Sequence, residues 1–123
     1  MTVEKHELKV STTGVAGSAS GSSVLAVPLS ELVAVYIDYH GSAPSTTDLT
    51  LKSPGNPVSV TLMTLTNTNT DAWKYPTVNL HDNVGAAVTG AYAAPVVHGN
   101  LVADLAQCDA LTDAVVLTVY LRV

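Results

Sequence analysis

The sequence predicts a single-domain, all-β sandwich or jelly-roll-like fold, from its composition, its hydrophobic alternation and the spacing of its turns. Hydrophobic residues make up 47% of the 123 positions while aromatic residues make up 5% and Phe is absent, so Val, Leu and Ala should form the core. Branched Val and Thr side chains favour extended strands. Turn residues recur at intervals of roughly ten, which predicts about seven or eight short antiparallel strands.

Alternation of apolar and polar residues marks the individual strands. In the segment Leu32–Tyr39 the odd positions Val33, Val35 and Ile37 are apolar, and we expect these three side chains to face the core. The segment 115–123 alternates in the same way along its whole length, which predicts a central strand.

Two further pairs of segments flank turn residues and predict β-hairpins. Segments 46–52 and 58–62 alternate and are separated by Pro54–Pro57, a turn sequence. Segments 77–80 and 86–89 flank a turn rich in Asp, Asn and Gly, which predicts a second, weaker hairpin.

The chain divides into three parts of one domain. Residues 1–11 are expected to form an N-terminal strand or arm that reaches a neighbouring subunit, and residues 12–23 a flexible loop rich in Gly and Ser. The sandwich body spans residues 24–123. Within this body we predict a strand over 96–105 and then a short helical or irregular connection through Asp109–Asp113.

Few side chains offer chemistry. Asp38 and His40 lie two apart on a predicted strand and could share a metal ion, whereas His81 and His98 are distant in sequence, so we interpret the histidines as surface or hydrogen-bonded residues. Cys108 is the only cysteine and is expected to be a small buried hydrophobe. Neither a nucleophile elbow nor a phosphate-binding loop occurs. We therefore expect no enzyme activity, catalytic residue, metal site or cofactor.

The charge balance bears on possible partners. Charged residues are 12% of the chain and the net charge is −5, with five scattered cations, so the sequence argues against nucleic-acid binding. No stretch of about twenty apolar residues exists, so we expect no membrane partner. A surface with so few charges suits a protein that packs against other subunits.

Aromatic residues supply the best candidate contacts. Trp73 and Tyr75 lie close together, and exposed rings of this kind stack on sugars or anchor protein interfaces. The alternative, which we favour for Trp73, is that its side chain is a core plug, buried in the core where a strand begins. The residues that we name as possible interface residues are Trp73, Tyr75, Tyr92, Val3, His6 and Leu8.

Three elements of the sequence carry a resemblance to a known family. They are the strand Ala34–His40 running into Pro44–Thr50, the segment Asn67–Pro76 with its Trp and Tyr, and the segment Val97–Gly99 ahead of the last strands. Over about two-thirds of its length the chain resembles the small β-rich head decoration (cement) proteins of tailed bacteriophages.

This resemblance implies a structural virion protein on the capsid exterior, assembled in the host cytoplasm. Such a protein stabilises the capsid by bridging subunits of the major capsid protein, and it associates with itself, most commonly as a homotrimer. The same features also fit a tail or head-tail connector protein. A third hypothesis, from the aromatic residues, is a carbohydrate-binding β-sandwich module.

Overall fold

The computed structural model describes residues 2–55 and 58–123, and in this part of the chain every regular element is a strand. The prediction of a single-domain, all-β sandwich is confirmed, with antiparallel pairing throughout. The strands are β1 (Val3–Val10), β2 (Ala19–Tyr39), β3 (Asp48–Ser53), β4 (Val60–Leu65), β5 (Ala72–Lys74), β6 (Val78–His81), β7 (Ala87–Ala93), β8 (Val96–Cys108) and β9 (Val115–Arg122).

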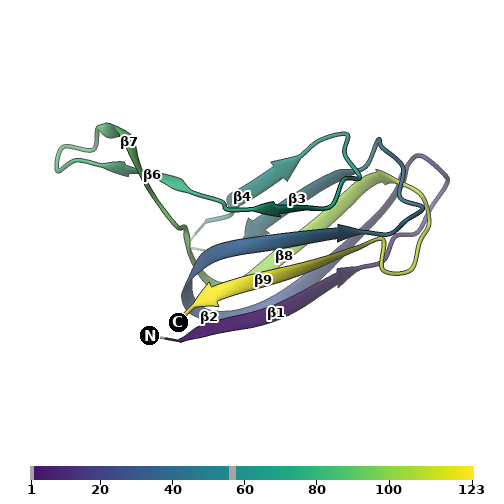
Figure 1. Ribbon diagram of the computed structural model, residues 1–123, viewed down its shortest axis with the longest axis horizontal. Helices are drawn as coiled ribbons and strands as arrows, with labels where there is room; N and C mark the ends of the chain where they lie inside the picture. The colour runs from purple at the N-terminus through teal and green to yellow at the C-terminus, as the bar shows by residue number, and fades with distance from the viewer. Residues whose placement is uncertain (1, 56–57) are drawn as a thin grey trace.

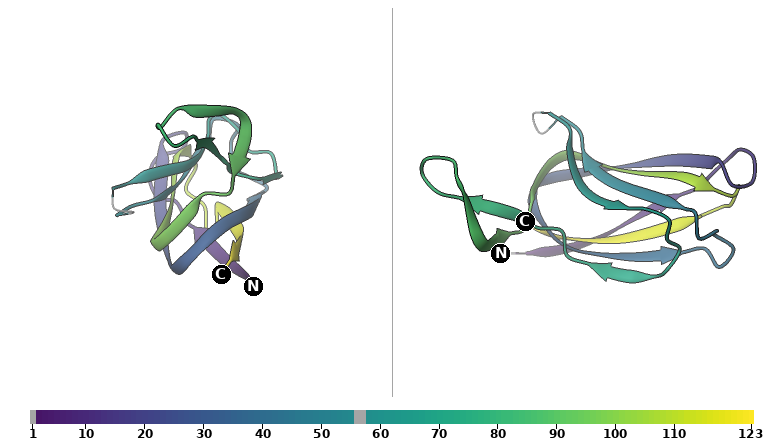
Figure 2. Two further views of the ribbon diagram at one scale, coloured as in Figure 1. Left: turned by 90° about the vertical axis from the view of Figure 1, so that its left-hand side faces the viewer. Right: turned by 90° about the horizontal axis from the view of Figure 1, so that it is seen from above.

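Strand β2 belongs to both layers of the sandwich. Its first part pairs with β8, and its last part pairs with β9 on one side and β5 on the other. The register shifts between Val27 and Ser30, around Pro28, which has no N–H to donate to a ladder. The strand bends there, so that the layer β1-β9-β2-β5 folds over the layer β2-β8-β3-β4 (Figures 1 and 2).

The core lies between these two layers. Strand β9 contributes four fully buried side chains at alternate positions, and it lies between β1 and β2, as predicted for a central strand. Burial of each such Val or Leu side chain contributes about 1.5–3 kcal/mol. The largest buried side chains are Leu32, Ile37, Leu49, Leu51, Leu101, Leu105, Leu117 and Leu121.

The expected core position of Val33 is wrong. Leu32 and Val35 are fully buried, whereas Val33 is only partly buried. The pairing of β2 with β9 steps from Leu32 to Ala34, so Val33 is an extra residue in a β-bulge. Because a bulge shifts the alternation by one position, the inward face changes from even to odd residues at this point.

Of the two forms expected for the N-terminal segment, a strand or an arm, the structure has the strand, which pairs within its own domain. Strand β1 pairs along its whole length with β9 of the same chain, from Val3 opposite Arg122 to Val10 opposite Val115. Leu8 and Val10 are buried in the core, and their burial favours this intramolecular pairing over an extended arm. The expectation for Met1 lies outside the described residues.

The predicted flexible loop over 12–23 is also partly wrong. Thr13 and Ser20 form a β-bridge, and β2 already begins at Ala19. Gly21 lies so close to the backbone of Ser11 that a Cβ atom would overlap the Ser11 carbonyl oxygen. The small residues of this segment therefore permit a close approach of two chain segments.

Both predicted hairpins are confirmed. In the first, Leu51 lies opposite Met63, and its turn includes Pro54 and Gly55, while Asn56 and Pro57 lie outside the described residues. The second is formed by β6 and β7. The predicted strand over 96–105 is the main part of β8, and the connection after it is an irregular turn.

Candidate interaction surfaces

The hairpin β6–β7 projects from the sandwich at the end where β2 bends and where β1 starts and β9 ends (Figures 1 and 2). It is inserted between β5 of one layer and β8 of the other. Every residue from Thr77 to Gly90 is exposed. The hairpin therefore has no core of its own and packs on neither layer along this stretch.

Three exposed side chains of the two hairpin strands are apolar. Val78 and Leu80 point to the same side because they are two apart on β6. On β7, Val88 follows Ala87, which lies opposite His81, and the register shifts between Asn79 and His81, so that Leu80 and Val88 lie in the irregular part of the ladder. The exposed fractions of Val78, Leu80 and Val88 are 44%, 46% and 40%. These three side chains form what we call the apolar hairpin face.

The tip of the hairpin is organised by Asp82. Its carboxylate oxygen Oδ1 accepts hydrogen bonds from the backbone N–H groups of Val84 (3.0 Å) and Ala86 (2.9 Å). The backbone N–H of Gly85 donates to the Asp82 carbonyl at 3.1 Å, and the φ angle of Gly85 is +85°. A side-chain carboxylate that closes its own turn gives the tip a defined shape.

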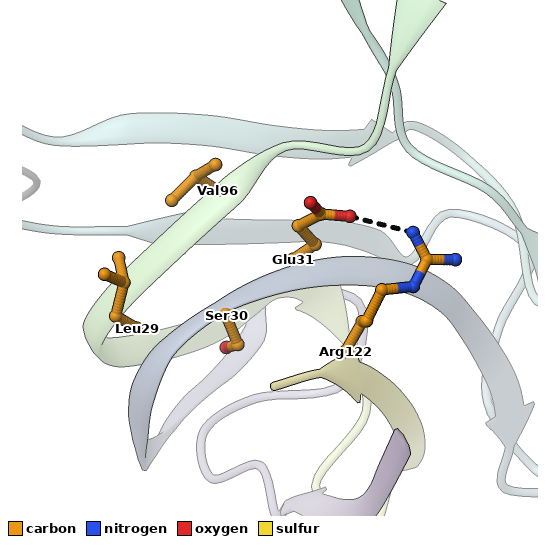
Figure 3. Close-up of a pocket in the computed structure, with 5 residues that line it drawn as sticks. All are labelled: Leu29, Ser30, Glu31, Val96 and Arg122. Carbon is orange, nitrogen blue, oxygen red and sulfur yellow. Dashed lines mark hydrogen bonds and ion pairs between the residues drawn. The ribbon is translucent and has the colours of Figure 1, made fainter. Parts of the chain in front are cut away.

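A shallow hollow of about 280 Å³ lies at the base of the hairpin (Figure 3). Leu29 and Val96 line one side, and both are exposed apolar residues. On the other side Arg122 Nη1 donates to Glu31 Oε2 at 2.9 Å. This ion pair is exposed and contributes little to stability. The apolar hairpin face and this hollow together are called the hairpin end below.

A second surface lies on the outside of the β1-β9-β2-β5 layer. The ring of Trp73 contacts three tyrosines, with centroid separations of 5.1 Å to Tyr36, 6.4 Å to Tyr75 and 5.7 Å to Tyr120. The rings of Trp73 and Tyr75 are almost parallel, at an interplanar angle of 13°. These four residues are called the aromatic face.

The interpretation of Trp73 as a core plug is wrong. The exposed fractions of Trp73 and Tyr75 are 49% and 64%. Trp73 lies opposite Tyr36 in the β2–β5 ladder, and Tyr36 points outward because its neighbours Val35 and Ile37 are both buried. Residues directly opposite each other share a face, so the ladder turns the indole outward.

The other proposed interface residues are scattered. Tyr92 is exposed on β7, far along the chain from the aromatic face, and Val3 is exposed on the edge strand β1. His6 is partly buried, with Nε2 3.0 Å from Glu4 Oε1. Leu8 is a core residue at 2% exposure and is not available as a surface contact.

Sequence reasoning missed two parts of these surfaces. Tyr36 and Tyr120 join the aromatic face, and their outward position was readable from the alternation of their strands, but their nearness to Trp73 required the strand order. The exposure of the apolar hairpin face was missed, because the alternation of residues in a hairpin does not reveal whether another layer covers the hairpin.

Among the described residues, ion contacts join ionisable side chains two at a time, as in Arg122 with Glu31. His40 Nδ1 accepts a hydrogen bond from the Ser42 backbone N–H at 3.0 Å, and Cys108 is buried. In residues 2–55 and 58–123 no three His, Cys, Asp or Glu side chains are grouped so that they could hold a metal ion. Burial, and to a smaller extent the neighbouring Asp71 carboxylate, raises the pKa of the Tyr39 phenol to about 12.

No family model matches the chain, and no curated protein and no solved structure matches it. The described residues also contain no helix that could span a membrane. We therefore infer function from the hairpin end, the aromatic face and the family resemblance.

Proposed function

We propose that this chain is a structural protein of a bacteriophage particle, which docks on the capsid through its hairpin end and stabilises the shell by bridging major capsid protein subunits. The observation that supports this proposal is the uncovered apolar hairpin face formed by Val78, Leu80 and Val88. An isolated two-stranded hairpin is marginally stable in water, and exposed apolar patches mark interaction sites.

The partner is a protein surface because the hairpin offers two kinds of contact at once. Its apolar side chains fit a dry pocket or a second apolar face. Its outer strand edges present backbone N–H and C=O groups that can pair with a strand of another chain. The hollow beside Leu29 and Val96 extends the same contact area at the hairpin base.

The capsid as partner comes from the resemblance to head decoration proteins. The low charge content of 12% supports it, since few ions must lose their water when such a surface is buried between subunits. The resemblance also implies the homotrimer as the assembled form. In this proposal the sandwich body stands on the shell exterior and the hairpin lies between capsid subunits.

The test is co-sedimentation with emptied capsids assembled from the major capsid protein of the same genome. Leu80→Asp and Val88→Asp each place a charge on the apolar hairpin face, and we expect binding to weaken by roughly ten-fold or more, as for an interface hot spot. Val24→Asp is the matched control, because Val24 is exposed on β2 beside β8, outside the hairpin end. Its binding should equal that of the unmodified protein.

Two outcomes contradict the proposal. If Leu80→Asp and Val88→Asp both bind capsids as well as Val24→Asp does, the hairpin is not the docking element. If the unmodified protein sediments with tails and not with capsids, its place in the particle is the tail or connector.

A further inference from the structure

We propose that the aromatic face is a second binding site, which takes a neutral polysaccharide with a sugar ring stacked on Trp73 and Tyr75. This site does not depend on the hairpin end or on the capsid. Pyranose rings present C–H groups on their faces and hydroxyl groups around their rims. Exposed, nearly parallel aromatic rings bordered by polar side chains are complementary to both features.

The strand register defines the surroundings of the rings. Tyr36 on β2 lies between Trp73 on β5 and Thr118 on β9, and these residues share the outward face. Beyond Thr118 the row continues to Glu7 on β1. In the next row Tyr120 lies opposite Lys5. The aromatic rings therefore share a continuous sheet face with polar side chains of β1 and β9.

The charges on this face indicate a neutral ligand. Lys5, Lys9, Glu7 and Asp38 are all exposed, and the alternation of β1 and β2 places them on the outer side, opposite to the buried Leu8 and Ile37. Two cations and two carboxylates cancel. An anionic polymer needs a surplus of cations, whereas sugar hydroxyls use donors and acceptors equally.

The Trp73 ring is held in place without a ligand. Strand β5 has three residues, and several hydrogen bonds tie the loop before it to the body, including the following two. The Tyr39 backbone N–H donates to Asp71 Oδ1 at 2.7 Å, and Asn69 Nδ2 donates to the Ala43 carbonyl at 2.8 Å. Because Trp73 also packs on the Tyr36 and Tyr120 rings, little ordering entropy is lost on binding.

Trp73 is the only tryptophan of the chain, so its fluorescence reports on this site alone. We would titrate the protein with hydroxyethylcellulose, dextran, galactomannan and a soluble β-1,3-glucan, with alginate as the acidic comparison. The expected result is a saturable change of Trp emission with at least one neutral polymer, matched by retardation in gels that contain this polymer. Alginate should give neither effect.

Variants of the aromatic residues distinguish the loss of ring stacking on the ligand from the loss of the folded state. Trp73→Ala and Tyr75→Ala should weaken retardation by roughly ten-fold or more, while Trp73→Tyr should retain a substantial part because it keeps a stacking ring. Tyr92→Ala is the matched control, because Tyr92 is a tyrosine of similar exposure on the hairpin. Circular dichroism and the melting temperature establish that each variant is folded.

Three results would overturn the proposal. The first is that no neutral polymer changes the Trp emission or retards the protein at any attainable concentration. The second is that Tyr92→Ala weakens retardation as much as Tyr75→Ala does. The third is a preference for alginate, which would indicate an anionic ligand in place of a neutral one.

Discussion

Asp82 and Ala86 are joined by two reciprocal hydrogen bonds at the tip of the projecting hairpin. The Asp82 backbone N–H donates to the Ala86 carbonyl at 2.9 Å, and the Ala86 backbone N–H donates to the Asp82 carboxylate at 2.9 Å. Hydrogen bonds within the hairpin thus fix the shape of its turn, although no layer packs against it. A docking element with a preformed shape loses less entropy when it binds.

Replacing Asp82 by Ala should loosen the hairpin tip and leave the sandwich intact. The variant lacks the acceptor for the Val84 and Ala86 N–H groups, so these amides should exchange with deuterium faster. The melting temperature should stay within about 2 °C, because exposed positions away from the core change stability little. Asp82→Asn, which keeps a side-chain oxygen, is the control and should preserve slower exchange. Equal exchange in Asp82→Ala and the unmodified protein would contradict this account of the tip.

Gly21 is expected to tolerate no side chain. Its Cβ would overlap the Ser11 carbonyl oxygen, so Gly21→Ala must shift the backbone where β1 leads into β2, at a cost of about 1–3 kcal/mol. Gly41→Ala is the matched control, because a Cβ at Gly41 meets no atom, and its effect should stay within about 0.5 kcal/mol. Urea denaturation measures both. Similar midpoints for the two variants would refute the close approach.

Thr12 is a buried hydroxyl that connects two distant loops. It donates to the Asp109 carbonyl and accepts a hydrogen bond from the Leu111 backbone N–H at 3.0 Å. Thr12→Val has the same shape but leaves these groups unsatisfied, which should lower the free energy of unfolding by about 1–3 kcal/mol. Thr12→Ser keeps the hydroxyl and should lose about 0.8 kcal/mol or less, for one methyl group. If Ser is as destabilising as Val, packing and not hydrogen bonding is responsible.

Asp104 should make stability depend on pH in the acid range. Burial raises the pKa of its carboxyl, but the hydrogen bond from Ser22 (2.7 Å) and the Lys52 ammonium (2.9 Å) outweigh this effect, so the pKa is lowered below 3.8. Its contribution is fully present above the unfolded pKa and is lost as the pH falls through the folded pKa. The effect is small because the pair is more than one-third exposed.

The measurement for Asp104 is the urea midpoint of the unmodified protein and of Asp104→Asn across pH 2–6. The difference between the two proteins should be largest at the upper end and should shrink on acidification. A difference that stays constant over this range would show that Asp104 does not act through its charge.

The sequence predicts where the strands of this fold lie in the chain much better than which side chains point inward and which residues become neighbours. Both hairpins and the central position of β9 follow from local alternation and turn chemistry, which do not depend on distant parts of the chain. The side of the sheet to which Val33 points does not follow from local alternation. A β-bulge shifts the alternation of β2 by one residue within a continuous apolar run.

Trp73 and Leu8 show the same limit for the candidate sites. Which way Trp73 points depends on its pairing with Tyr36, a residue 37 positions earlier on another strand. Leu8 is buried because β1 pairs with the opposite end of the chain. Sequence reasoning selected Trp73 and Tyr75 by residue type, but only the strand order shows that they form one face with Tyr36 and Tyr120.

Docking of the hairpin end on a capsid is tested most directly by amide hydrogen exchange of the protein, free and bound to emptied capsids. We expect amides of β6 and β7 to exchange readily in the free protein and to slow by roughly ten-fold or more on the capsid. The exchange of amides in the exposed residues 14–18, in the loop between β1 and β2, should not change. Unchanged exchange in β6 and β7, with protection appearing on another surface of the bound protein, would contradict the account.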